Sequence, residues 1–93
     1  MVTQAAKISP RSPQIADTLG WMKLQRQDRQ GALPLLQRAH DLDTQNPEIG
    51  YHLAVALDAN GKRAEAKTLL LSVLQTNAKF DGVEEAKQLV TRW

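Results

Sequence analysis

The sequence predicts an all-α protein built from two copies of one helical hairpin. When the chain is shifted by 34 residues it matches itself, because Pro13 falls on Pro47 and Leu36 falls on Leu70. Within each copy, apolar residues recur every three or four positions, a spacing that places them along one face of a helix. A fixed period of this kind is typical of helical arrays, in which each unit buries its apolar face against a neighbour.

The first helix of each copy has a clear start signal. Ser12-Pro13 opens the first copy and Asn46-Pro47 opens the second. A Ser or Asn side chain can accept a hydrogen bond from an unpaired N–H, and proline suits the first helical position. We therefore expect helices over about 13–25 and 47–60. Gly61 tolerates positive φ and should end the second of these helices.

The second helix of each copy is expected over about 30–42 and 62–76. Pro34 is out of place in the earlier one, because proline beyond the first turn removes a hydrogen bond and clashes with the preceding turn. The regular helix should therefore begin near Gly31 or Ala32, which would put Pro34 in its first turn.

The last segment, 81–93, is predicted to form a capping helix that ends near Arg92. Asp81 and Glu84 have the spacing of a capping box, with an acceptor in front of the helix and Glu three residues later. The exposed side of this helix is rich in charged residues, as the outer face of a terminal unit usually is. Trp93 is expected to pack back on the cap or to meet another chain.

Composition excludes several functional classes. The chain has 93 residues, a net charge of +2 and no cysteine, so we expect one small domain without disulfides or thiolate metal sites. Acidic and basic residues are spread over both halves, unlike those of a nucleic-acid-binding protein. The longest apolar run, 69–71, is far shorter than the roughly 20 residues that span a bilayer. Neither nucleic-acid binding nor membrane insertion by this segment is expected.

Catalytic motifs are also missing from the sequence. It contains no nucleophile elbow, glycine-rich phosphate loop or paired-carboxylate arrangement. His40 and His52 fall on different predicted helices, and no convergent partner for either is evident. The sequence therefore predicts a non-catalytic protein without a metal or a cofactor.

Small residues at equivalent positions of the two copies resemble the tetratricopeptide repeat. The family has a large apolar residue followed by Gly or Ala in its first helix, and an Ala-apolar-Ala pattern in its second. These positions are Leu19-Gly20 and Leu53-Ala54, then Ala32, Leu36 and Ala39 in the first copy and Ala66, Leu70 and Val73 in the second. The sequence departs from the pattern where Thr44 and Ala78 replace the closing proline.

The resemblance implies a right-handed superhelix of antiparallel helix pairs, with units at 13–46 and 47–80 and the capping helix at 81–93. Residues 1–12 would be the tail of a truncated preceding repeat. In that arrangement the first helix pair is poorly covered, and exposed apolar faces of several hundred Å² are uncommon. We therefore expect self-association through the N-terminal end.

The family binds peptides on the exposed side of its first helices, which implies a partner-binding groove here. Trp21 and Tyr51 are the leading candidates, since each offers a large contact area with a polar tip; the alternative is that both only pack between helices. The predicted groove residues are Asp17, Thr18, Trp21, Leu24, Gln25, Tyr51, His52, Val55 and Asp58, with Gln14 and Glu48 on the same side.

One groove of the family can be excluded from the residues present. Its clamp for chaperone tails needs Lys, Arg and Asn at positions that here hold Asp17, Trp21, His52, Gly82 and Ala86. A C-terminal carboxylate would meet no cationic partner. The expected ligand is therefore neutral, basic or apolar.

The sequence thus predicts a protein-interaction module that binds a protein or peptide segment in its groove. The alternative is a structural role, as the capped end of a longer solenoid whose binding site lies upstream. The stretches 16–21, 46–49 and 51–54 also resemble the C-terminal part of bacterial repeat lipoproteins of exopolysaccharide and exosortase systems. That likeness would place the parent protein at the cell envelope, although no targeting signal is visible.

Overall fold

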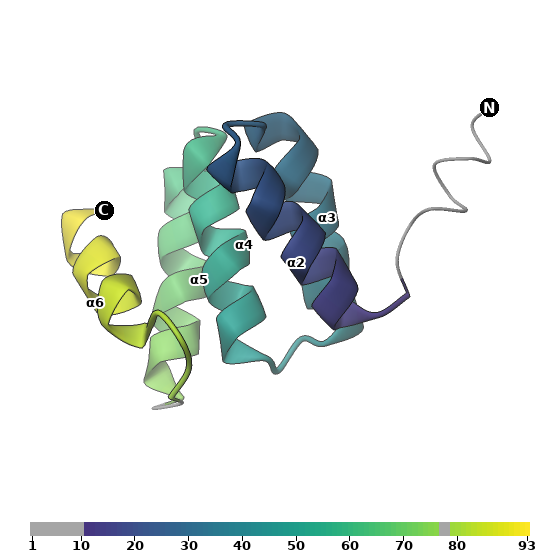
Figure 1. Cartoon of the computed structure of the whole chain (residues 1–93). Helices are drawn as coiled ribbons and strands as arrows, with labels where there is room; N and C mark the ends of the chain where they lie inside the picture. Colours follow the sequence, from purple (N-terminus) through teal and green to yellow (C-terminus); the bar gives the residue numbers. More distant parts are fainter. Residues whose placement is uncertain (1–10, 77–78) are drawn as a thin grey trace.

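The protein folds as two antiparallel helix pairs followed by a single helix (Figure 1). The computed structural model describes residues 11–76 and 79–93, so most of the expected N-terminal tail lies outside the described residues. The helices are α2 (Pro13–Gln25), α3 (Arg29–Leu42), α4 (Pro47–Ala59), α5 (Arg63–Gln75) and α6 (Val83–Arg92). No strand occurs in the described part, and the all-α prediction is confirmed.

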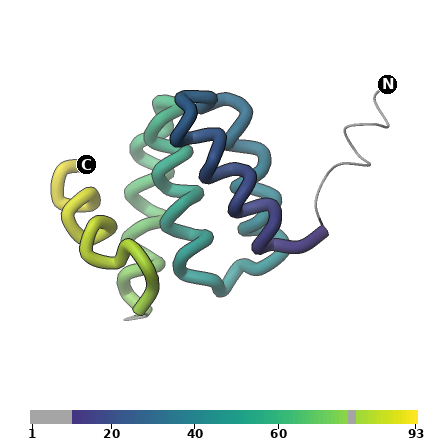
Figure 2. The backbone as a smooth tube through the Cα atoms, in the orientation of Figure 1, coloured from purple at the N-terminus to yellow at the C-terminus, as the bar shows by residue number. Residues whose placement is uncertain are grey.

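The helices stack in a continuous series. α2 packs on α3 and α4 on α5, while α3 lies against α4 and α6 lies against α5. The path of the backbone makes this order visible, with the chain running up and down through successive helices (Figure 2). α2 also contacts α4. The first helices of the two pairs are therefore neighbours, which is what a shared groove requires.

The predicted starts and ends of α2 and α4 are confirmed. The Ser12 hydroxyl accepts a hydrogen bond from the Ile15 N–H at 3.4 Å, and the Asn46 side chain accepts one from the Ile49 N–H at 3.2 Å. Beyond the ends of α2 and α4, Gln27 and Gly61 have φ values of 71° and 81°. Equivalent positions of the repeat thus adopt the same left-handed turn.

The predicted start of α3 is wrong. The helix begins at Arg29, because Asp28 acts as its N-cap and accepts a hydrogen bond from the Gly31 N–H at 3.0 Å. This bond, with a smaller contribution from Lys23, holds the pKa of the Asp28 carboxyl below its usual value. Pro34 consequently lies inside the helix, past the first turn, and contributes no backbone N–H there.

The capping box predicted for α6 does not form. The N-cap is Gly82, in the left-handed conformation with φ of 94°, and no side chain caps the helix. A Cβ atom on Gly82 would lie 2.7 Å from Cε2 of Tyr51. Both the backbone angle and the close approach of the tyrosine ring therefore favour glycine at this position. The predicted end near Arg92 is confirmed.

The core contains small residues where helices meet. A Cβ atom on Gly20 of α2 would lie 2.6 Å from Cγ of Leu36 in α3, and one on Gly50 of α4 would lie 2.6 Å from Cγ2 of Val73 in α5. Each pair of helices thus approaches closely at a glycine. Every helix also contributes at least one fully buried alanine: Ala16, Ala32, Ala39, Ala54, Ala56, Ala66 and Ala86. Ala16 and Ala39 form a small separate cluster with Ile49, and the others belong to the main core.

Candidate functional site

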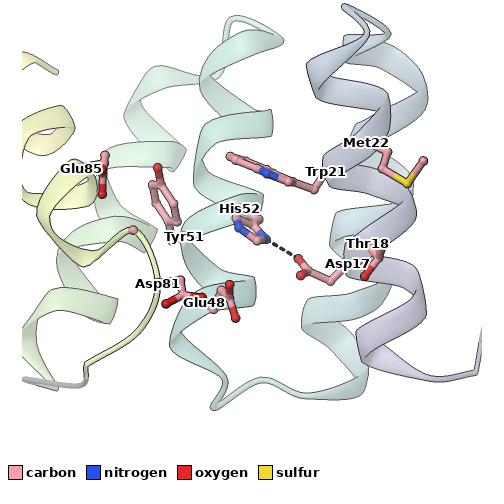
Figure 3. A pocket seen from close by; sticks show the side chains of 10 residues that line it. Asp17, Thr18, Trp21, Met22, Glu48, Tyr51, His52, Asp81 and Glu85 are labelled. Atoms are coloured by element: carbon pink, nitrogen blue, oxygen red, sulfur yellow. Dashed lines mark hydrogen bonds and ion pairs between the residues drawn. The ribbon is translucent and has the colours of Figure 1, made fainter.

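A cavity of about 430 Å³ opens between α2, α4 and the start of α6. Its walls combine aromatic rings with acidic side chains, which converge from the three helices (Figure 3). The lining residues are Asp17, Thr18, Trp21, Met22, Glu48, Tyr51, His52, Asp81, Gly82 and Glu85. One helix from each pair and the segment at the start of α6 together form this space.

The structure brings together five of the nine predicted groove residues and separates the others. Asp17, Thr18, Trp21, Tyr51 and His52 line the cavity. The other four lie elsewhere: Leu24 and Val55 pack against the core, Gln25 is exposed at the end of α2, and Asp58 forms an ion pair with Arg63 at 2.8 Å.

The two aromatic candidates differ in burial. The Trp21 ring is half-buried and stacks on His52, with ring centroids 4.0 Å apart and planes tilted by 20°. Tyr51 is only 8% exposed, and its ring lies 5.9 Å from the Phe80 ring. Tyr51 is thus mainly a packing residue that forms part of the cavity wall. Trp21 both packs between helices and presents ring surface to the cavity.

A buried hydrogen bond joins α2 to α4 beside these rings. Nδ1 of His52 lies 2.6 Å from Oδ1 of Asp17, and the two side chains are 9% and 14% exposed. The expectation that His52 has no convergent partner is therefore wrong. The partners are 35 positions apart, and only the docking of the two helix pairs places them together. His40 lies outside this cavity.

The cavity wall is strongly acidic. Asp17, Glu48, Asp81 and Glu85 line it, and none of the lining residues is Lys or Arg. Glu48 and Glu85 lie in the first turns of α4 and α6, where the helix dipole stabilises a negative charge. Burial, and secondarily the charge of Glu85, raises the pKa of the Tyr51 hydroxyl.

Four lining residues were not among the predicted groove residues: Met22, Asp81, Gly82 and Glu85. A signal for two of them was present in the sequence. A second shift of 34 residues carries Glu48 to Gly82 and Tyr51 to Glu85. The start of the capping helix therefore continues the groove positions of the repeats. No comparable signal identifies Met22 or Asp81.

The described residues form neither a metal-binding cluster nor a membrane-spanning helix. Across residues 11–76 and 79–93, no group of three or more His, Asp and Glu side chains is arranged to hold a metal ion. None of the described helices combines the length and the apolar character needed to span a bilayer.

Residues 23–92 match the profile of a family described as tetratricopeptide repeat. The match begins near the end of α2 and reaches the last turn of α6, so it includes three of the four paired helices in full. No curated protein and no solved structure matches the chain. The matched residues make up well over half of the sequence, and the helix pairs stack as repeats do. The chain therefore belongs to the tetratricopeptide repeat family.

Proposed function

We propose that this protein is a non-catalytic interaction module that holds a segment of a partner protein in the cavity between α2, α4 and α6. The repeat family makes protein–protein interaction the general function. The cavity, at about 430 Å³, lies within the range of roughly 300–1,000 Å³ that is usual for ligand pockets. It suits a few residues of an extended segment rather than a folded surface.

The observation that carries this proposal is the position of Trp21. Its ring stacks on the His52 ring, with centroids 4.0 Å apart, and its centroid lies 6.0 Å from that of the Tyr51 ring. An aromatic side chain that is already held in place loses little conformational freedom when a ligand binds. Such anchored tryptophans commonly dominate binding energy.

A second cavity, of about 560 Å³, lies between α3, α4 and α5 and provides an internal comparison. It is lined by Leu53, Leu57, Leu69 and the exposed Thr68, among others. Thr18 lines the first cavity and Thr68 the second, and each is an exposed residue of a helix. Replacement of each by arginine tests which cavity holds the partner segment.

The experiment starts from random peptides displayed on phage and selected on the full chain. We expect Thr18→Arg to lose binding of the selected peptides because its long side chain fills the proposed site, while Thr68→Arg retains it. Circular dichroism should find both variants as helical as the parent. Loss of binding in Thr68→Arg alone would place the site between α3, α4 and α5. Failure to select any peptide would favour a structural role as the capped end of a solenoid.

Truncation of Tyr51 is a poor test of this site. Its ring is buried against Phe80 and lies over Gly82, so Tyr51→Ala would leave a void that costs about 3–5 kcal/mol. Loss of binding would then reflect loss of folded protein. Thr18 avoids this problem because its side chain is exposed.

A further inference from the structure

We infer that the cavity between α2, α4 and α6 recognises an arginine side chain of the partner segment; this inference rests on the proposed function. The guanidinium group is bound by the carboxylates of the wall and lies against the ring of Trp21. Three independent features of the cavity support this: its charge, its aromatic surface, and a ring nitrogen of His52 that remains available to a ligand.

The first feature is a local charge opposite to that of the whole protein. The chain has a net charge of +2. The cavity wall holds four carboxylates and no Lys or Arg, and so carries a formal charge of −4 with His52 neutral. A cleft lined by one sign of charge concentrates ligands of the opposite sign. An anionic ligand would be repelled.

These charges are mostly uncompensated within the described residues. Three of the six acidic side chains outside the cavity have a cationic partner: Asp28 pairs with Lys23, Asp58 with Arg63, and Glu84 with Lys87. No ion pair in the described part involves Glu48, Asp81 or Glu85. These three carboxylates, which line the cavity from α4, α6 and the turn before α6, therefore remain available to a cation from outside.

The second feature favours a guanidinium over an ammonium group. Trp21 and Tyr51 lie side by side on the wall, with ring planes at 47°, and aromatic faces attract cations. Arginine stacks on such a face through its planar group and still directs five N–H donors outward in the plane. The carboxylates come from α2, α4, α6 and the turn before α6. A broad, flat donor satisfies this arrangement better than a compact ammonium.

The third feature is the free nitrogen of His52. The residue is 7% exposed, and its hydrogen bond uses Nδ1. In the described part, no buried side-chain nitrogen or oxygen lacks a hydrogen-bond partner. Among residues 11–76 and 79–93, Nε2 has no hydrogen-bond partner, so it keeps contact with solvent, and the cavity is an opening that His52 lines. In the tautomer whose Nδ1–H donates to the Asp17 carboxylate, Nε2 is an acceptor and can take an N–H from the ligand.

The direct test is an NMR titration of the full chain with acetyl-Ala-Arg-Ala-amide. The matched probe has citrulline in place of arginine, which keeps the shape and removes the charge. We expect saturable shifts at the Trp21 indole and around His52, with affinity at least about tenfold higher for arginine than for citrulline. A lysine peptide should bind more weakly than the arginine peptide. Raised salt should weaken arginine binding, because the contacts are partly exposed.

Two neighbouring glutamates provide the matched variants. Both side chains are exposed, but Glu85 lines the cavity, whereas Glu84 does not line it and pairs with Lys87. Glu85→Gln should weaken binding of the arginine peptide by about threefold to tenfold, while Glu84→Gln leaves it unchanged. Equal effects of the two substitutions would indicate only general attraction to an acidic protein and would overturn the inference.

The outcomes for the two proposals are separable. If the arginine and citrulline peptides bind equally, or neither binds, arginine selection is wrong. The groove function would nevertheless stand if phage-selected peptides without arginine bind the parent and fail to bind Thr18→Arg. Selected peptides enriched in Asp and Glu would contradict the charge argument directly.

Discussion

Oδ1 of Asp17 and Nδ1 of His52 lie 2.6 Å apart and link the first helices of the two hairpins. The residue equivalent to His52 in the first copy is Thr18, one position beyond Asp17. The hydrogen bond therefore connects adjacent positions of successive units. Both residues line the cavity, and the bond also holds the His52 ring on which Trp21 stacks.

We expect this bond to stabilise the docking of the hairpins. Asp17→Ala and His52→Ala should each lower the free energy of unfolding by about 1–3 kcal/mol, because each leaves a buried polar group without its partner. The double variant should cost less than the sum of the two. Urea denaturation of the four proteins gives the coupling energy. Strictly additive costs would mean that the contact contributes nothing.

Gly82→Ala should weaken the docking of α6. An alanine would be strained at φ of 94°, and its Cβ would meet the Tyr51 ring at 2.7 Å. Gly61 is the matched control, since it has φ of 81° but open space around it. Gly61→Ala should cost about 1–2 kcal/mol from backbone strain alone. Gly82→Ala should cost more, and equal costs in urea denaturation would exclude a role for the Tyr51 contact.

The raised pKa of Tyr51 predicts a loss of stability at alkaline pH. Below pH 10.0, the ordinary pKa of a tyrosine, the Tyr51 hydroxyl keeps its proton in both the folded and the unfolded chain. The contribution of this group to the free energy of unfolding is then at its full value. As pH rises further, the unfolded chain loses its proton first, so the free energy of unfolding falls. Because Tyr51 is the single tyrosine, tyrosinate absorbance reports its titration alone.

The Tyr51→Phe variant is the control for this pH dependence. It removes the hydroxyl and keeps the ring, so its alkaline loss of stability should be smaller than that of the parent. Glu85→Gln should lower the Tyr51 pKa part of the way towards its ordinary value, because burial, the larger cause of the shift, remains. A tyrosinate titration at the ordinary value would contradict the burial of the hydroxyl.

Pro34→Ala should stabilise the protein. The residue is exposed inside α3, where it contributes no N–H to the helix, and the substitution should raise the free energy of unfolding by about 1–3 kcal/mol. Pro47→Ala is the control, because proline at the first position of α4 loses no internal bond. Thermal denaturation should therefore separate the two variants, and a gain of similar size in both would argue against this cause.

Self-association remains an expectation that the exposed side of α2 supports. Ile15, Leu19 and Met22 follow one another at helical spacing and are 56%, 40% and 42% exposed. Leu53, the equivalent of Leu19, is only 2% exposed. Sedimentation equilibrium at increasing concentration should detect dimers or larger species that Leu19→Glu abolishes. Leu71→Glu, on α5 and 41% exposed, should not have this effect. A monomer at all concentrations would refute the expectation.

The repeat period and the starts of α2 and α4 could be predicted because they depend on local chemistry. Ser12 and Asn46 cap the helices that follow them regardless of what those helices pack against. Leu36 and Leu70, which are 34 residues apart, are likewise equivalent in the structure, since both are fully buried in the core. The errors arose where two local signals competed. At Pro34 the proline rule was outweighed by the N-cap at Asp28, and at Asp81 the capping spacing was outweighed by the left-handed Gly82.

The cavity could be predicted only in part, because its walls come from distant segments. The positions of Trp21 and Tyr51 follow from helical periodicity, but burial of the tyrosine depends on Phe80 and Gly82 beyond the second hairpin. The pairing of Asp17 with His52 depends on how far one hairpin is rotated against the next. A single sequence has no direct signal for that rotation.

The three-helix origin of the cavity has a thermodynamic consequence. Its wall exists only while α2, α4 and α6 are docked, so an occupant binds the native chain and has no equivalent site on the unfolded one. By mass action, a ligand at a hundred times its dissociation constant would then add about 2.7 kcal/mol of stability. In a bound complex, the occupant would hold the last helix in place as well as being held by it.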